Sequence, residues 1–250
     1  RPLISQYLLE ELEETQILYR PQDFYERMRV DAFLGLPAEA VDFPSRYVKV
    51  ASGEKIPYEH LLIAVGGRPF FPRIEGITAD GALAPGIFTF MSLQDAKLIR
   101  NYLPRIERVV VIGGGLIGLQ AAEALANLRR KVTVVEFMDR LLSPVLDRRA
   151  STMVEETFKA NGVEIRTSTA AKAISFAHGE SFTGTSGEAP KEEHPEKARA
   201  HKLPQAVVLE SGDVLPCDMV IIATGVVPRK ELVEGSGMAV NKGILVNERM

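Results

Sequence analysis

The sequence predicts an α/β fold built on a parallel sheet, and three observations support this prediction. Apolar runs alternate with amphipathic helical segments between residues 108 and 167, as in a parallel sheet with helices on its faces. A glycine-rich turn directly follows the first of these runs. Two similar strand ends, "IAVGGRP" and "IIATGVVPR", lie too far apart for a solenoid repeat and indicate two related lobes.

The first hundred residues predict short elements. Residues 20–30 are expected to form a short helix with Pro21 in its first turn, where the missing N–H costs nothing. Ser92 and Asp95 have capping-box spacing and predict a helix over residues 92–103. The remaining apolar and β-branched runs predict strands at 30–34, 39–43 and 47–51, a turn at 52–53 and a buried strand at 60–65.

The middle of the chain predicts a regular βαβαβ order. Its strands are expected at 108–112, 131–137 and 163–167, and its helices at 116–128 and 147–162, the second ending at Asn161-Gly162. A charged stretch rich in Gly, Pro and Ser at about 175–205 breaks this order and predicts an exposed hairpin extension or a mobile loop. The spacing of His178, His194 and His201 within it is not typical of metal ligands, so no metal site is expected.

The glycine turn Gly113-x-Gly115-x-x-Gly118 has the spacing of a dinucleotide-binding motif. Gly113 allows a tight turn, Gly115 allows a pyrophosphate to approach the backbone, and Gly118 allows the helix to press against the strand. The first N–H groups of the helix, at its positive dipole end, would then face the anion. The alternative is a glycine-rich turn that binds no ligand.

Glu136 ends the second strand and predicts the choice of coenzyme. A carboxylate at this place accepts hydrogen bonds from the ribose hydroxyls, whereas a 2′-phosphate would meet like charge. The next residues, Phe137 and Met138, carry no positive charge, and Arg140 lies further on. The sequence therefore predicts NAD, with NADH preferred over NADPH.

Composition narrows the range of functions. The 250 residues carry a net charge of −3 without a basic block, which argues against nucleic acid and membrane partners. The single cysteine, Cys217, excludes an intrachain disulfide and a cysteine zinc cluster, and is expected to serve packing. No export signal opens the sequence, and a reducing cytoplasm is expected.

Together these motifs resemble the FAD-dependent pyridine nucleotide-disulfide oxidoreductase superfamily, in its branch of NADH oxidases, rubredoxin and ferredoxin reductases and nitrite reductase flavoproteins. The resemblance implies a Rossmann-like NAD-binding lobe, a βαβαβ parallel sheet plus an antiparallel hairpin layer, inserted into a partial FAD-binding lobe. It assigns residues 1–104 to the FAD lobe, 105–229 to the NAD lobe and 230–250 to the return into the FAD lobe. It also implies an internal fragment that lacks the N-terminal FAD fingerprint and the C-terminal interface domain.

The resemblance implies a set of cofactor-binding residues. For the NAD pyrophosphate these are Gly113, Gly114, Gly115, Leu116, Ile117 and Gly118, with Glu136 and Phe137 at the ribose. For the nicotinamide half they are Ala223, Thr224 and Gly225. For FAD they are Ala64, Val65, Gly66 and Arg68, with Ala40 or Val41 near the adenine.

The sequence departs from the family pattern at three places. Val65 replaces the usual Thr, which removes one hydroxyl. Gln120 replaces a common Glu near the nicotinamide and flavin, which puts an acid–base role there in doubt. No cysteine lies near the segment "RPLIS", so disulfide chemistry there is not expected. No residue is identified as a general acid or base.

The resemblance implies that the whole protein transfers hydride from NADH to FAD. Electrons would pass on to a protein carrier, dioxygen or a small inorganic acceptor, and the whole protein would form a homodimer. This 250-residue chain on its own is expected to show no hydride-transfer activity. The alternative is a non-catalytic NAD(H)-binding module that serves as a redox sensor or assembly factor.

Overall fold

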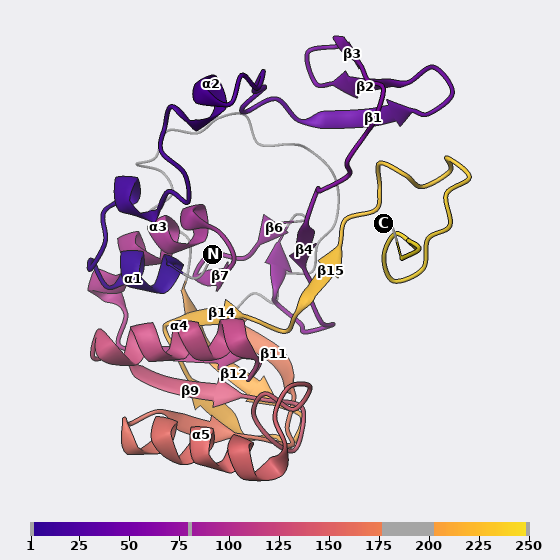
Figure 1. Ribbon diagram of the computed structural model, residues 1–250. Helices are drawn as coiled ribbons and strands as arrows, with labels where there is room; N and C mark the ends of the chain where they lie inside the picture. Colours follow the sequence, from indigo (N-terminus) through magenta and orange to yellow (C-terminus); the bar gives the residue numbers. More distant parts are fainter. Residues whose placement is uncertain (1–2, 80–81, 177–202, 249–250) are drawn as a thin grey trace. The chain divides into compact units, whose positions relative to one another are not determined.

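The computed structural model describes residues 3–79, 82–176 and 203–248 (Figure 1). They form two compact units, one made of Arg1–Ile17 and Pro69–Gly225 and one made of Leu18–Arg68 and Val226–Met250. The lobe boundaries expected after residues 104 and 229 concern which cofactor each segment binds, and they stay a prediction. Most of the interrupting stretch, with its three histidines, lies outside the described residues. No helix in the described ranges is long and apolar enough to cross a lipid bilayer.

A five-stranded parallel sheet forms the centre of the first unit. Its order is β10-β9-β8-β14-β7, so the chain runs outward from β8 to β10 and returns through β14 between β8 and β7. The strands are β7 (Ile87–Thr89), β8 (Arg108–Ile112), β9 (Lys131–Val135), β10 (Glu164–Arg166) and β14 (Met219–Ile222). The predicted α/β fold class and the βαβαβ order are confirmed.

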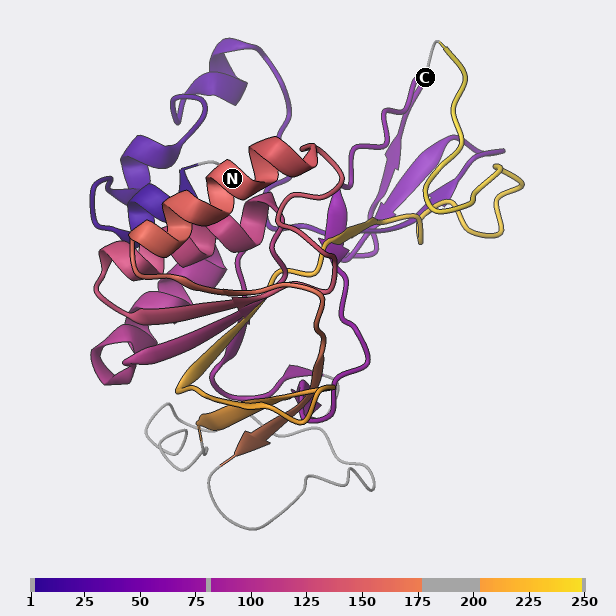
Figure 2. The same cartoon turned by 90° about the horizontal axis from the view of Figure 1, so that it is seen from below.

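The sheet is covered on both faces, by helices on one and by an antiparallel sheet on the other (Figure 2). Val109 and Val111 pack toward the helices, whereas Val110 and Ile112 pack toward the antiparallel strands. Burial on both faces explains why β8 is a continuous apolar run. The helices are α1 (Ile4–Leu8), α3 (Leu93–Tyr102), α4 (Leu116–Asn127) and α5 (Arg148–Ala160), and the strands are β11 (Ala171–Phe176), β12 (Pro204–Leu209) and β13 (Val214–Pro216).

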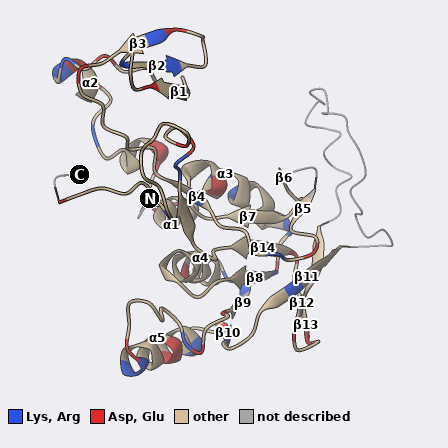
Figure 3. Cartoon of the chain, turned by 90° about the vertical axis from the view of Figure 1, so that its right-hand side faces the viewer, with Lys and Arg blue, Asp and Glu red and all other residues tan. Residues whose placement is uncertain are grey.

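Side-chain caps fix the starts of two helices, and the cap of α3 was predicted from the sequence. The hydroxyl of Ser92 accepts a hydrogen bond from Asp95 N at 3.1 Å, and the Asp95 carboxylate accepts one from Ser92 N at 3.1 Å, which completes the capping box of α3. At α5 the Asp147 carboxylate accepts from Ala150 N at 2.8 Å. Helix α5 carries charges of both signs (Figure 3) and ends before Gly162, whose φ of +80° suits a glycine.

Smaller elements complete the first unit. They are the 3₁₀ helices η1 (Glu14–Ile17) and η2 (Leu103–Arg105), and the two-stranded pair of β5 (Thr78–Ala79) and β6 (Ala82–Leu83). Cys217 lies fully buried in the core under the antiparallel strands, which confirms its packing role. Burial raises the pKa of its thiol to about 12, so the thiol stays protonated at neutral pH.

The second unit contains an antiparallel sheet of β1 (Ala38–Asp42), β2 (Tyr47–Val50) and β3 (Lys55–Pro57), with a turn at 52–53 as predicted. It also contains α2 (Phe24–Arg27), β15 (Val226–Pro228) and most of the strand paired with β15, β4 (Gly67–Pro69), whose last residue belongs to the first unit. The short helix expected within 20–30 is present as α2, although it covers only four residues. Two predictions are wrong here, because the runs at 30–34 and 60–65 form no strands. Both runs are largely exposed and have no pairing strand among the described residues, and an apolar run becomes a strand only when a neighbour takes its backbone hydrogen bonds.

Asp218 ties two central strands together at their amino ends. Its carboxylate accepts hydrogen bonds from Arg108 N at 2.8 Å, from Glu107 N at 3.1 Å and from the Arg108 Nη2 at 2.8 Å. Burial alone would raise the pKa of Asp218, but the hydrogen bonds from Arg108 and Glu107 outweigh it and leave the pKa lowered. The ionised carboxylate therefore stabilises the start of β8 against β14.

We predict that Asp218→Ala lowers the free energy of unfolding by roughly 1–2 kcal/mol at pH 7, because it leaves two backbone N–H groups and a guanidinium without their acceptor. A lowered pKa means that this contribution is present above about pH 4 and is lost as the pH falls through the folded-state value. Urea unfolding at pH 7 and at pH 3 should show the difference from wild type shrinking in acid. Asp213→Ala, which removes an exposed carboxylate from the β12–β13 turn, is the control. Equal losses in the two variants would contradict the prediction.

Candidate functional site

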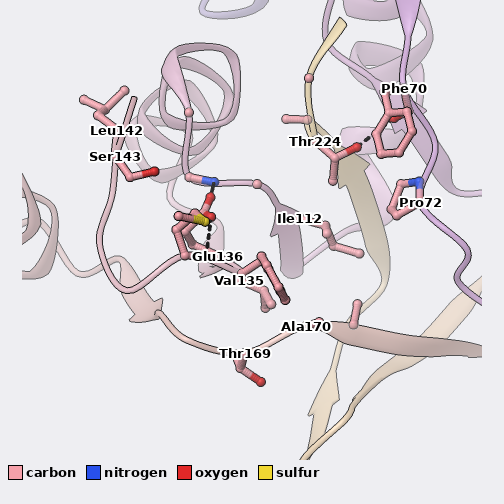
Figure 4. A pocket seen from close by; sticks show the side chains of 18 of the residues that line it. Phe70, Pro72, Ile112, Val135, Glu136, Leu142, Ser143, Thr169, Ala170 and Thr224 are labelled. Atoms are coloured by element: carbon pink, nitrogen blue, oxygen red, sulfur yellow. Dashed lines mark hydrogen bonds between the residues drawn. The ribbon is translucent and has the colours of Figure 1, made fainter. Parts of the chain in front are cut away.

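A cavity of about 530 Å³ lies in the first unit, where β8, β9, β10 and β14 end (Figure 4). The carboxyl ends of parallel strands are where ligands bind in open α/β sheets. Eight of the predicted site residues line it together: Gly113, Gly114, Gly115, Glu136, Phe137, Ala223, Thr224 and Gly225. Leu116, Ile117 and Gly118 belong to the first turn of α4 and do not line the cavity.

The three motif glycines serve different needs. Gly113 has a φ of +115°, and a Cβ there would overlap the carbonyl oxygen of Ala223. A Cβ on Gly118 would overlap the carbonyl oxygen of Gly113, so this glycine allows α4 to lie against β8. A Cβ on Gly115 would meet nothing within 4 Å. The fold therefore requires Gly113 and Gly118, whereas Gly115 leaves open space beside the cavity.

Glu136 connects the glycine turn to the end of β9. Its Oε2 accepts a hydrogen bond from Gly114 N at 2.5 Å, and its Oε1 accepts one from Met138 N at 2.7 Å; Figure 4 shows its carboxylate beneath the turn. A carboxylate has about four acceptor sites, so each oxygen can accept a further hydrogen bond from a ligand. The predicted bond to a ribose stays a prediction.

The positive charges next to this end of the cavity are already paired. Arg140 Nη1 lies 2.9 Å from Asp139 Oδ1, and Arg148 donates a short hydrogen bond to the other oxygen of Asp139. Arg140 Nη2 also donates to the carbonyl of the lining residue Ser143 at 3.2 Å. The hydrogen bond from Arg148 lowers the pKa of Asp139, so the carboxylate stays ionised. Among the described residues, no Lys or Arg lines the cavity.

The opposite end of the cavity joins two segments that are distant in sequence. Thr224 Oγ1 donates to the Phe70 carbonyl at 2.7 Å, and Phe70 N donates to the Gly225 carbonyl at 3.0 Å. These bonds hold residues 70–74 against the end of β14, and Figure 4 shows Phe70 and Pro72 beside Thr224. The contact supplies an apolar wall that the sequence analysis missed.

The other lining residues missed from the sequence come from strand ends and from two connecting segments. Ile112 and Val135 end β8 and β9. The segment after β9 contributes Met138, Leu142, Ser143 and Pro144, and the segment between β10 and β11 contributes Thr169 and Ala170, with Ala171 at the start of β11. Their positions at or near strand ends were the available signal, because strand ends of a parallel sheet meet at one edge. Nothing in their residue types marked them.

The residues predicted for FAD lie in the second unit and only some come together. Ala40 and Val41 line a second cavity of about 220 Å³ with residues of the segment 231–236. Arg68 pairs with Glu231 of that segment at 3.4 Å. Ala64, Val65 and Gly66 are exposed and line neither cavity. Their role with FAD stays a prediction. Gln120 is exposed on α4.

We predict that Gly115→Ala weakens NADH binding at least tenfold while lowering the free energy of unfolding by no more than about 1 kcal/mol, because the new methyl enters open space at a helix N-cap. Gly118→Ala should instead cost about 1–3 kcal/mol or more of folding stability, because it separates α4 from β8. Thermal unfolding and NADH fluorescence titration on both variants test this contrast. A Gly115→Ala protein that binds NADH like wild type would show that no ligand uses the open space.

Comparison with known proteins agrees with this architecture. A family model described as pyridine nucleotide-disulphide oxidoreductase matches residues 1–250. A rubredoxin-NAD(+) reductase from Ectopseudomonas oleovorans is 28 % identical over 249 residues, which are 100 % of this chain and 57 % of that protein. A terpredoxin reductase from a Pseudomonas species is 32 % identical over 247 residues, 99 % of this chain and 53 % of that protein.

Among solved structures, a ferredoxin reductase from Rhodopseudomonas palustris matches with a TM-score of 0.83 at 25 % identity. The match covers 98 % of this chain and 54 % of that chain. The chain thus spans a little over half the length of the relatives it matches.

Proposed function

The chain belongs to the pyridine nucleotide-disulphide oxidoreductase family, and on that premise we propose that the whole protein transfers hydride from NADH to FAD. The observation that carries the proposal is the open space at Gly115, at the mouth of a cavity that already holds eight of the predicted coenzyme residues. A dinucleotide needs this approach to the backbone, because its pyrophosphate binds the N–H groups at the start of α4.

Different cavity residues would bind different parts of the coenzyme. The glycine turn would hold the pyrophosphate, Glu136 the adenosine ribose, and Ala223 to Gly225 the nicotinamide half. The apolar wall of Phe70, Pro72 and Ile74 would exclude water from the nicotinamide ring. Hydride transfer needs the reacting atoms held roughly 3–3.5 Å apart and no proton from the protein, so positioning is the main task of these residues.

When FAD is bound, it would accept the hydride from NADH and pass the electrons to a further acceptor. We assign Ala40 and Val41, which line the cavity of the second unit, to its adenine end. Ala64, Val65, Gly66 and Arg68 would line the rest, and Arg68 pairs with Glu231, which lines the same cavity as Ala40 and Val41. In this proposal residues 105–229 form the NAD lobe, and residues 1–104 with 230–250 belong to the FAD lobe.

We further propose that the acceptor is a small redox protein and that the reaction takes place in the cytoplasm. The relatives named above are reductases of rubredoxin, terpredoxin and ferredoxin, which supports such an acceptor. These names support an enzyme over a non-catalytic redox sensor.

A first test uses the whole protein reconstituted with FAD. We expect NADH to bleach the flavin absorbance and the reduced protein to reduce a small iron–sulfur protein such as rubredoxin, followed by absorbance. Flavin that NADH does not reduce would overturn the proposed function and favour the sensor. Flavin that is reduced while rubredoxin and ferredoxins stay oxidised would overturn the proposed acceptor alone.

A second test concerns the choice of coenzyme. We predict that NADH binds more tightly than NADPH, by about 1–3 kcal/mol, because a 2′-phosphate would meet Glu136 in a cavity that no Lys or Arg of the described residues lines. Asp139→Asn should narrow this gap, because it releases Arg140 and Arg148 from their ion pairs. Glu136→Arg should narrow or reverse it, but that variant also loses the acceptor of Gly114 N–H.

Fluorescence titration of both coenzymes measures the gap. Glu155→Gln is the matched control, because it removes one negative charge from the pair with Lys159 on α5. An equal gap in the Asp139→Asn and wild-type proteins would contradict the predicted role of Asp139. Equal affinity of the wild type for the two coenzymes would contradict the NADH preference itself.

A further inference from the structure

Ser151 is a buried polar side chain that the proposed function does not use. It lies on α5, is 1 % exposed, and its hydroxyl donates a hydrogen bond to the Leu141 carbonyl at 2.7 Å. Among the described residues, Thr89 is the other buried polar side chain, and its hydroxyl bonds to Asp95 of a helix cap. Ser151 instead binds the loop that follows β9, beside the cavity.

The next residue of that loop, Leu142, adopts a backbone conformation that is rare for a leucine. Its φ is +51°, and such a residue keeps this conformation only where its surroundings hold it. The Leu142 N–H donates to the Gly114 carbonyl at 3.0 Å. Leu142 thus links the Ser151 side of the loop to the glycine turn.

These contacts form a chain through two peptide groups. The Leu141 carbonyl and the Leu142 N–H belong to one peptide group, and the Gly114 carbonyl and the Gly115 N–H belong to the next. Each peptide group is planar and trans, so its C=O and its N–H point in opposite directions. A hydrogen bond that fixes the carbonyl therefore also fixes the direction of the N–H. The chain therefore runs from the Ser151 hydroxyl through both groups to the Gly115 N–H, which makes no hydrogen bond within the described part of the chain.

The end of the chain lies where the coenzyme anion is proposed to bind. Gly115 precedes α4 and has open space where a side chain would be. Glu136 fixes the other side of the turn by accepting from Gly114 N, so both backbone groups of Gly114 are held. Hydrogen bonds in such a chain also polarise one another, which strengthens the last donor.

We propose that Ser151 is a positioning residue for the coenzyme pyrophosphate, acting through the peptide groups of Leu141–Leu142 and Gly114–Gly115 to aim and polarise the Gly115 N–H. The inference rests on the proposed NADH function. It differs from a purely structural role, because it links a hydroxyl on α5 specifically to the phosphate part of the ligand.

Ser151→Ala tests the inference through ligands that share the adenosine but differ in the pyrophosphate. We expect NADH and ADP-ribose to bind roughly three- to tenfold more weakly, the effect of one weakened hydrogen bond, while adenosine binding stays unchanged. Thr157→Ala is the matched control, because its hydroxyl lies on the same helix and bonds the Met153 carbonyl within that helix. An equal loss for all three ligands, or no loss, would overturn the inference.

A second measurement uses the unsubstituted whole protein and does not depend on the variant folding. In amide NMR spectra, ADP-ribose should shift the amide protons of both Leu142 and Gly115, whereas adenosine, which lacks the pyrophosphate, should shift them less. A Leu142 amide that does not respond to ADP-ribose would overturn the inference even if the ligand binds. Failure of the unsubstituted whole protein to bind NADH and ADP-ribose would instead overturn the proposed function.

Discussion

The close contact between α4 and β8 is the constraint on which the site depends. Because Gly118 has no side chain, the helix can rest on the Gly113 carbonyl, and the small Ala223 leaves room for this approach. The contact brings the free N–H groups of the helix to the edge where the strands of the sheet end. A longer side chain at this point would lift the helix and separate its positive end from the carboxylate and the loops that complete the cavity.

Much of the first unit could be predicted from the sequence, because its signals are local. The capping box at Ser92, the glycine after α5 and the apolar run of β8 are each readable within a few residues. The errors fall where structure depends on distant partners. Strand β7 is three residues long and exists because β14 pairs with it, whereas the apolar run at 60–65 has no described strand beside it.

The same distinction applies to the site. Gly113, Gly115 and Glu136 were predicted because their residue types are needed for what they do. Phe70 was missed because it reaches the cavity through contacts with Thr224, 154 positions away. Leu142 was missed for another reason, because it contributes a backbone N–H that any residue except proline could offer. Only its unusual φ reveals the constraint, and side-chain chemistry gives no sign of it.

The burial of Cys217 gives the chain a useful practical property. A thiol reacts as its thiolate, and this one is both inaccessible and held protonated by its surroundings. The folded chain should therefore remain unlabelled by maleimide and iodoacetamide reagents although it contains a cysteine. Single cysteines introduced at exposed positions could then carry fluorescent or spin probes without first removing the native one.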